Sequence, residues 1–575
     1  MTKIALVGLN ARYSHSNLAI KYLKESTKDI KTVDIYDFTI NDEIEKIIRV
    51  LLKQNYSHIG FSVYIWNKQE IFRLIKAIKN INQDTKIIVG GPEVSYDGKS
   101  LMVENDNIDY VLSGEGEESF RHLVHSLVND KDPEHESILF RKDSEILGGT
   151  VPGIISNINH IPNLYMDEKY LDENKYVYYE ASRGCPFRCA FCLSSTTAGV
   201  RFKNIETVLK ELETLLNNNV KLVKFIDRSF NSNPKQKEII QYLIDNDNGI
   251  TTFHMELHPS LIKEEFIDLI KLARKDLFQF EVGLQTTNIK TAKEIERVGT
   301  YDEIHKICSD LIKVGAHIHI DLIAGLPYED LESFSKSFND LYNIKPDKIQ
   351  LGFLKLLKGS RLRIDAGKYN YRFFEDAPYE FISNNWISYS EVLQLKAVED
   401  VVERYYNEGF FSKTTEYLIQ SNYKNAWDFY LSLSVYWDNN EYMYNNISRI
   451  ELYNVLYRYC VQEHPEDLDI IAELLIYDYY KSGNRKSSKF VLSDFHKNID
   501  KETIQELLRE NANTIEGRTG IVVTEILKHS IIESFNINPK LDNKTFSKEF
   551  EDKVYIIFVN LQKTVEDIIL KLERI

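Results

Sequence analysis

The chain has 575 residues, of which 43% are hydrophobic and 27% are charged, a composition typical of a globular protein with several domains. Its formal net charge of −16 disfavours nucleic-acid phosphates as the main partner. No apolar run suits a membrane span, the first apolar stretch is too short for a signal peptide, and five cysteines do not suggest a disulfide framework. We therefore expect a cytoplasmic protein without a membrane partner.

The first part of the sequence alternates predicted strands with predicted helices. Runs rich in β-forming residues lie at 3–9, 32–38, 58–64, 86–92 and 110–116, and segments with helical spacing of apolar residues separate them. This alternation predicts a Rossmann-like, doubly wound parallel sheet over residues 1–135. In such a sheet the ligand lies beyond the carboxyl ends of the strands.

A second alternating region follows an irregular segment, 136–172, which we interpret as a linker with room for a β-arm. Its predicted strands lie at 176–181, 222–227, 252–257, 278–284, 317–323 and 348–354. Six strand–helix units over residues 173–370 predict an incomplete, TIM-like (β/α)6 barrel. Catalytic groups are then expected at the carboxyl ends of its strands.

The last region, residues 371–575, has a different pattern. Long helices are predicted over 384–409 and 448–464, and short strands over 488–495 and 554–561. The fold class is therefore α/β, with a mainly helical C-terminal domain in which no motif indicates a function.

Three of the five cysteines, Cys185, Cys189 and Cys192, lie within eight residues in the stretch "GCPFRCAFC". Thiolates are soft ligands that suit zinc or iron–sulfur clusters. A structural zinc site normally has four protein ligands, whereas three thiolates on a four-iron cluster leave one iron open to another ligand. The sequence favours the cluster, and a zinc site completed by a distant ligand is the alternative.

The C-x3-C-x2-C spacing after the first barrel strand, with the aromatic Phe191 before the last cysteine, resembles the radical S-adenosylmethionine (radical SAM) superfamily. The resemblance implies a [4Fe–4S] cluster on the three cysteines. Its open iron would bind the amino and carboxylate groups of SAM, and electron transfer would cleave SAM to a 5′-deoxyadenosyl radical.

Other segments extend this resemblance to SAM contacts at the ends of the barrel strands. The candidates are Asp227, Arg228, Glu281, Gln285, Arg297 and Gly325. Asp227 and Arg228 stand where similar enzymes bind the SAM amino group, although the usual Gly-Gly-Glu form is absent. "FEVGLQTTN" resembles the ribose and methionine contacts, and "HIDLIAGLPYED" resembles the motif beside the adenine. Arg297 is the candidate partner of the SAM carboxylate, which an arginine fork suits.

The strand ends of the first domain resemble the cobalamin-binding domain that precedes many radical SAM domains, over residues 3–130. The candidate contacts are Ser62, Tyr64, Gly90, Gly91, Glu93, Gly114, Glu115 and Gly116. Small residues there let a large flat ligand approach the backbone. A G-x-G-x-x-G fingerprint is absent, which disfavours NAD or FAD. The D-x-H-x-x-G motif is also absent; His15 is expected to contact the corrin edge or backbone, with cobalt ligation as the alternative.

The resemblance implies a cobalamin-dependent radical SAM enzyme that transfers a methyl group to an unactivated carbon of a small molecule or peptide. A low-potential donor such as flavodoxin or ferredoxin would supply electrons. Three alternatives stay open: rearrangement or cyclisation without methyl transfer, methylthiotransfer, and a corrinoid or redox sensor. Methylthiotransfer is disfavoured because residues 1–184 contain no cysteine for a second cluster. No catalytic side chain is assigned.

Overall fold

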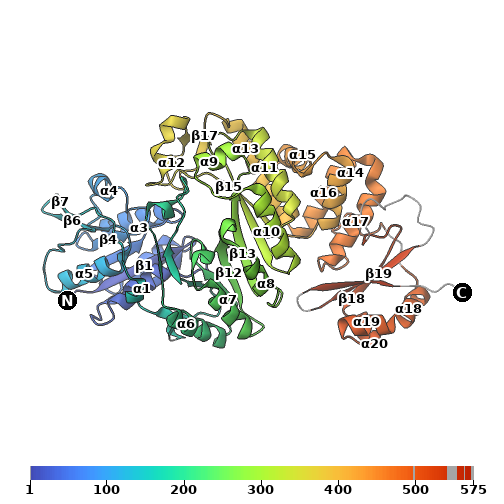
Figure 1. Ribbon diagram of the computed structural model, residues 1–575, viewed down its shortest axis with the longest axis horizontal. Coiled ribbons are helices and arrows are strands. Elements are labelled where there is room, and N and C mark those ends of the chain that lie inside the picture. The colour runs from blue at the N-terminus through green and yellow to red at the C-terminus, as the bar shows by residue number, and fades with distance from the viewer. Residues whose placement is uncertain are drawn as a thin grey trace. The chain divides into compact units, whose positions relative to one another are not determined.

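The computed structural model describes residues 2–166, 168–197, 199–495, 499–540, 553–561 and 564–570. The chain forms two compact units, one containing nearly all residues up to Tyr389 and the other those from Ser390 onward (Figure 1). The first unit contains two layered α/β parts. Among the described residues, no helix is both long and apolar enough to cross a membrane.

The first sheet has seven strands in the order β2-β1-β3-β4-β5-β6-β7. Its parallel strands are β1 (Ile4–Asn10), β2 (Val33–Thr39), β3 (His58–Ser62), β4 (Lys86–Gly90) and β5 (Tyr110–Leu112). The chain order reverses between β1 and β3, which is the switch point where doubly wound sheets bind ligands. The predicted Rossmann-like fold is confirmed.

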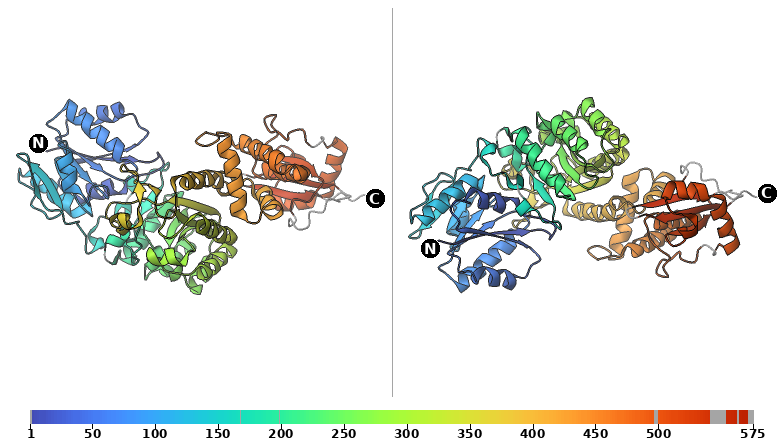
Figure 2. Two further views of the ribbon diagram at one scale, coloured as in Figure 1. Left: turned by 90° about the horizontal axis from the view of Figure 1, so that it is seen from above. Right: turned by 90° about the horizontal axis from the view of Figure 1, so that it is seen from below.

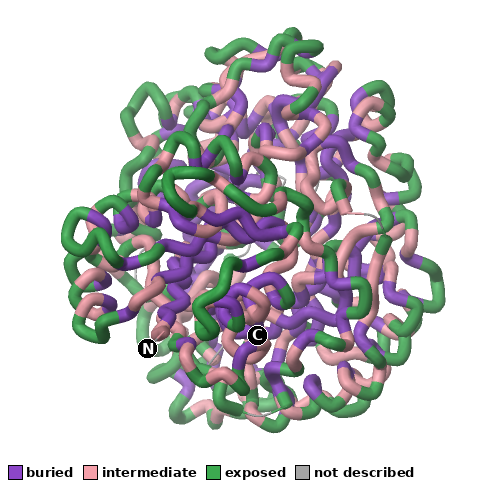
Figure 3. The backbone as a smooth tube through the Cα atoms, turned by 90° about the vertical axis from the view of Figure 1, so that its left-hand side faces the viewer, coloured by how far each residue is buried: buried purple, intermediate pink, exposed green. Residues whose placement is uncertain are grey.

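Helices cover both faces of this sheet because both faces of its strands are apolar. One face packs on α1 (Leu18–Ser26) and α5 (Gly116–Val128). The other packs on α2 (Ile44–Leu52), α3 (Lys68–Ile81) and α4 (Gly98–Glu104). The strands β1, β3 and β4 are accordingly almost wholly buried, and Figure 3 shows buried stretches of the chain inside and exposed stretches at the periphery.

The sheet continues beyond residue 135 into the segment interpreted as a linker. β6 (Ile138–Lys142) pairs antiparallel with β5, and β7 (Glu145–Gly148) pairs with β6. Ile138 and Leu139 of β6 are buried in the two cores of the sheet, which explains why this arm stays attached. The connecting segment therefore begins only after Gly148.

The second part is the six-stranded barrel, with strand order β15-β14-β13-β12-β11-β8. The strands are β8 (Val177–Tyr179), β11 (Leu222–Phe225), β12 (Thr252–Leu257), β13 (Phe278–Gln285), β14 (His317–Ala324) and β15 (Lys348–Phe353). Its main outer helices are α6 (Ile205–Asn217), α7 (Gln236–Asp245), α8 (Glu264–Ile270), α10 (Tyr301–Lys313) and α11 (Leu331–Ile344) (Figure 2). All six predicted strands are present.

Alternation along the central barrel strands separates an apolar side from a polar side. In β13 and β14, buried apolar residues alternate with partly exposed ones such as Glu281, His319 and Asp321. Because successive side chains of a strand point to opposite faces, these polar groups share one face of the sheet.

The second unit is mainly helical, as predicted. Its larger helices are α13 (Tyr389–Val402), α14 (Ser412–Asn422), α15 (Ala426–Asn439), α16 (Arg449–Glu463), α17 (Leu468–Lys481) and α18 (Lys501–Glu510). An antiparallel sheet of β18 (Ser530–Phe535), β19 (Val554–Asn560) and β20 (Val565–Leu570) follows. The predicted strand at 554–561 is confirmed.

The predicted strand at 488–495 is wrong, because this segment forms turns instead. Phe490 is buried and its ring stacks on Tyr479 at a centroid distance of 4.1 Å. The apolar residues of the segment therefore anchor a loop on helix α17 and do not enter a sheet.

Candidate functional site

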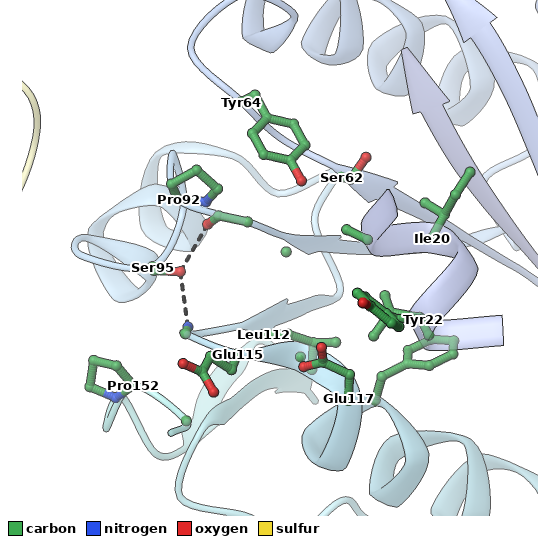
Figure 4. A pocket seen from close by; sticks show the side chains of 18 of the residues that line it. Ile20, Tyr22, Ser62, Tyr64, Pro92, Ser95, Leu112, Glu115, Glu117 and Pro152 are labelled. Atoms are coloured by element: carbon green, nitrogen blue, oxygen red, sulfur yellow. Dashed lines mark hydrogen bonds between the residues drawn. The ribbon is translucent and has the colours of Figure 1, made fainter. Parts of the chain in front are cut away.

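A cavity of about 640 Å³ lies at the carboxyl ends of β3, β4 and β5, beside the switch point between β1 and β3 (Figure 4). Seven of the predicted cobalamin contacts line it: Ser62, Tyr64, Gly90, Gly91, Gly114, Glu115 and Gly116. Apolar side chains such as Leu6, Ile20 and Leu112 supply much of the remaining wall. An apolar cleft with a few converging polar groups is typical of a cofactor site.

Two glycines of this cavity are required by the backbone around them. Gly91 has φ +110°, and a Cβ there would lie 2.6 Å from the carbonyl oxygen of Val63. Gly114 has φ +81°, and a Cβ there would lie 2.4 Å from the backbone nitrogen of Gly153. The Ser95 hydroxyl joins both loops, because it donates to the Gly91 carbonyl at 2.8 Å and accepts from the Gly114 amide at 3.0 Å (Figure 4). Closely packed backbone without side chains thus forms this side of the cavity, which fits a large flat corrinoid.

Two residues predicted for this site, Glu93 and His15, are not among those that line the cavity. The buried Glu93 carboxylate accepts from the Tyr379 hydroxyl at 2.6 Å and lies 3.6 Å from the Lys68 ammonium. The Nδ1 atom of His15 lies 3.0 Å from the Tyr178 hydroxyl, and Trp66 is exposed and stacks on Tyr64. Glu93 therefore ties the first sheet to the segment after the barrel.

The three clustered cysteines lie on the loop that connects the two strands of a short hairpin. The hairpin pairs β9 (Ser182–Gly184) with β10 (Val200–Phe202). Gly184 closes it, since its φ is +101° and a Cβ would lie 2.3 Å from the Gly199 carbonyl oxygen. Cys189 is buried, whereas Cys185 and Cys192 are partly exposed. Burial raises the pKa of the Cys185 thiol, and a bound metal would favour its thiolate.

Unsatisfied buried groups lie beside this loop. The Arg297 guanidinium contacts the Cys189 sulfur through Nη1 at 3.7 Å and donates through Nη2 to the Gly283 carbonyl, while its buried Nε has no partner among the described residues. The buried Oε1 of Gln285 also has no partner there. Buried polar atoms are nearly always paired in proteins, so a ligand such as SAM fits this place.

No three His, Cys, Asp or Glu side chains of the described residues are close enough to hold one metal ion. Cysteines of an iron–sulfur cluster bind different irons and do not share a single ion.

The remaining predicted SAM contacts lie in different environments. Asp227 is 0% exposed, accepts from the Ala181 amide at 3.0 Å and from the Ser182 hydroxyl, and burial raises its pKa to about 7. Arg228 lies 3.8 Å from Glu256 in an exposed pair.

Glu281 lies on the polar face of the barrel sheet. It faces His254 Nε2 at 3.1 Å, and this contact lowers the pKa of its carboxyl. Gly325, with φ +92°, accepts at its carbonyl from the Tyr371 hydroxyl at 2.7 Å and from the Asn384 amide at 3.0 Å. The structure thus places Arg297 against the cysteine loop, with Gln285 next to it. Asp227 instead binds the backbone and side chain at the start of the cysteine hairpin.

Sequence reasoning missed Glu117, Glu180 and Arg183, which also line the cavity of the first sheet. Two of them, Glu180 and Arg183, precede the first cysteine of the cluster by only a few residues. Their position in "EASRGC" was visible, but nothing in the pattern indicated that they face a cavity of another domain.

The fold and the site define a class of enzyme in which a doubly wound sheet with a large cofactor cavity precedes a partial barrel with three cysteines on its first loop. Comparisons with known proteins agree. Residues 4–124 match the B12 binding domain, residues 179–341 match the Radical SAM superfamily, and residues 367–558 match a protein family of unknown function, DUF4080. The chain therefore belongs to the B12-binding radical SAM enzymes, with an uncharacterised C-terminal domain. Its cofactors are cobalamin, SAM and an iron–sulfur cluster, as predicted.

Among curated relatives, an uncharacterized methyltransferase from Pyrococcus horikoshii, PH0819, is 25% identical over 357 residues, covering 60% of this chain and 77% of that protein. The cobalamin-dependent radical SAM methyltransferase TokK from Streptomyces tokunonensis is 23% identical over 303 residues, covering 49% of this chain and 44% of TokK. The chain thus spans less than half of the length of TokK.

Two solved structures share the fold. The cobalamin-dependent SAM radical enzyme OxsB, with aqua-cobalamin bound, aligns with a TM-score of 0.59 and 15% identity, covering 85% of this chain and 82% of OxsB. The radical SAM methyltransferase TsrM from Kitasatospora setae, with tryptophan substrate and a SAM analog bound, aligns with a TM-score of 0.53 and 16% identity, covering 64% of this chain and 76% of TsrM. At these identities the likeness concerns the fold.

Proposed function

We propose that this chain is a cobalamin-dependent radical SAM methyltransferase that acts on an unactivated carbon, with a [4Fe–4S] cluster on Cys185, Cys189 and Cys192. One observation carries the proposal: Thr196 and Thr197, which follow the cysteines on the same loop, line the cavity of the first sheet. The cobalamin cavity and the cluster loop are therefore neighbours within one compact unit. This proximity is what a reaction using both cofactors on one substrate needs.

The bound cofactors would supply the difficult chemistry, namely radical formation from SAM at the cluster and methyl transfer by cobalamin. The chain contributes binding, orientation and exclusion of water. Arg297 is proposed to hold the SAM carboxylate, because its Nε is a buried donor without a partner beside Cys189. Gln285 and Glu281 are proposed to contact the rest of SAM from strand β13.

The cavity residues are proposed to hold the corrinoid. The close backbone packing at Gly91 and Gly114 supports this assignment, since side chains at these positions would need the strand ends to move. The substrate is proposed to be a small molecule or peptide, with flavodoxin or ferredoxin as the electron donor in an anaerobic cytoplasm. The methyltransferase names of PH0819 and TokK support methyl transfer over rearrangement.

The test is the set of products formed from SAM. The full chain would be purified without oxygen, reconstituted with iron, sulfide and cobalamin, and given SAM with a low-potential reductant. Both S-adenosylhomocysteine and 5′-deoxyadenosine are expected. 5′-Deoxyadenosine alone would contradict methyl transfer and favour rearrangement or cyclisation. Neither product, with cluster and corrinoid bound, would contradict the enzyme assignment and favour a sensor.

A further inference from the structure

The hairpin that carries the cysteine loop also carries two arginines directly opposite each other. Arg183 on β9 is the register partner of Arg201 on β10, and Arg183 stands two residues before Cys185. Like charges opposite each other on neighbouring strands destabilise a hairpin unless carboxylates compensate them. The hairpin therefore depends on acidic groups supplied from elsewhere in the fold.

Three carboxylates supply that compensation, and two of them belong to the first domain. The Arg201 fork donates to both oxygens of Glu115 at 2.9 and 2.7 Å. Arg183 donates to Glu180 at 2.9 and 2.8 Å and to Glu117 at 2.9 Å, and lies 3.3 Å from Glu115. Glu115 and Glu117 lie at the start of helix α5, so these pairs fasten the cluster-bearing hairpin to the first sheet.

This ion-pair group also forms part of the cavity wall. Glu115, Glu117, Glu180 and Arg183 all line the cavity, and their side chains keep 7–17% of their surface exposed. Excluding water strengthens the Coulomb attraction between paired charges, and separating a pair that is cut off from water leaves each charge uncompensated. A corrinoid in the cavity would remove that water and favour the fastened position of the hairpin.

We propose that Arg183 and Arg201 couple the two cofactor sites, so that cobalamin binding and cluster assembly on the cysteine loop strengthen each other. The inference rests on the proposed function, because it takes the cavity as the cobalamin site and the cysteines as the cluster ligands. The two states are the hairpin fastened to α5 and the hairpin released. Cobalamin favours the first state from the cavity side, and the cluster favours it by fixing the loop between β9 and β10.

Coupling between two binding sites is reciprocal, and its usual size is a 5- to 150-fold change in affinity. Arg183 acts here as a positioning residue, since its guanidinium is directed at the carboxylates of Glu180 and Glu117 and acts on the cluster through the hairpin. A role in stability alone would lower the affinity for cobalamin equally with and without the cluster. The ratio of the two affinities therefore isolates the proposed role.

The experiment measures the dissociation constant of hydroxocobalamin without oxygen, for full-length protein with the reconstituted cluster and without it. We expect at least fivefold tighter binding with the cluster in the unaltered protein, and a ratio close to one in Arg183→Met. Arg183→Lys keeps the charge but not the fork, so its ratio should lie between these values. Arg121→Met is the control. It removes an exposed ion pair between Arg121 of helix α5 and Asp29, and it should leave the ratio unchanged.

The reverse measurement checks reciprocity. Saturating hydroxocobalamin should slow removal of cluster iron by a chelator in the unaltered protein and have little effect in Arg183→Met. If Arg183→Met does not fold, Glu117→Gln removes one partner at constant size and should lower the ratio. Equal affinities with and without the cluster, or an unchanged ratio in variants that fold, would overturn the inference.

The coupling and the proposed reaction fail in distinguishable ways. Absence of hydroxocobalamin binding in both forms would overturn both. If hydroxocobalamin binds more than fivefold tighter with the cluster than without it, but the protein forms no SAM products, the inference stands and the proposed reaction is contradicted.

Discussion

Asp227 offers a test that separates SAM binding from folding. The sequence predicts that it contacts the SAM amino group, whereas the structure buries it completely behind the start of the cysteine hairpin. Its carboxylate accepts from the Ala181 amide and the Ser182 hydroxyl. Asp227→Asn keeps the shape of the side chain and removes its charge.

Burial disfavours the charged form and raises the pKa of Asp227 from its usual value of 3.8 to about 7. The folded protein then binds this proton more tightly than the unfolded chain does. The stabilisation is complete below pH 4, decreases as the pH rises, and is lost above pH 7. Each pKa unit corresponds to about 1.4 kcal/mol, so the full effect is about 4 kcal/mol, of which about 2.6 kcal/mol falls between pH 5 and pH 8.

Urea unfolding at pH 5 and pH 8 measures this difference. Relative to the unaltered protein, Asp227→Asn should become more stable by about 2.6 kcal/mol on going from pH 5 to pH 8. Asp245→Asn, at an exposed position at the end of helix α7, should show no such change. Equal pH dependence in Asp227→Asn and the unaltered protein would refute the reasoning.

SAM affinity provides the second measurement on the same variant. If Asp227 only supports the hairpin, Asp227→Asn should bind SAM within about threefold of the unaltered protein, which is under 1 kcal/mol. A loss of more than about tenfold would support the contact that the sequence predicts.

Three further changes test other parts of the molecule. Cys185→Ala should abolish cluster iron after reconstitution together with SAM cleavage, whereas Cys308→Ala, on helix α10, should retain both, as iron analysis and product assays will show. Lys203→Met should lower the free energy of unfolding in urea by about 3–5 kcal/mol, because it leaves the buried carboxylate of Glu211 without the ammonium that lies 3.0 Å away. The double variant Lys203→Met with Glu211→Leu should recover most of this loss. Gly91→Ala should destabilise the protein by about 1–3 kcal/mol and weaken hydroxocobalamin binding in titrations, since φ is +110° and the Cβ would meet a backbone oxygen.

The strands of both α/β parts could be predicted because each is a short run of β-forming residues bounded by turn residues. Thr252–Leu257 has the predicted bounds, and Phe278–Gln285 differs from its prediction by one residue. The strand predicted at 488–495 was wrong because an aromatic anchor and a strand look alike in one sequence. Spacing also could not show that Glu93 pairs with Tyr379, since 286 residues separate the two.

The candidate sites were predictable to the extent that they depend on local motifs. Three cysteines at fixed spacing and glycines at strand ends are visible in the sequence, and both predict loops that would hold cofactors. The wall between the two sites is not local. It joins Glu115 and Glu117 after β5 to Arg183 on β9, which lies 66 residues beyond Glu117.

Because of these contacts, the boundary between the two predicted domains does not separate the cavity of the first sheet from the cysteine hairpin. The cavity takes part of its lining from Glu180, Arg183 and Thr196, all outside the segment that matches the B12 binding domain. The hairpin in turn takes its charge compensation from helix α5 of that domain. Because residues of both predicted domains line the cavity, the first domain alone does not contain the whole of it, and cofactor loading should be measured on protein that contains both domains.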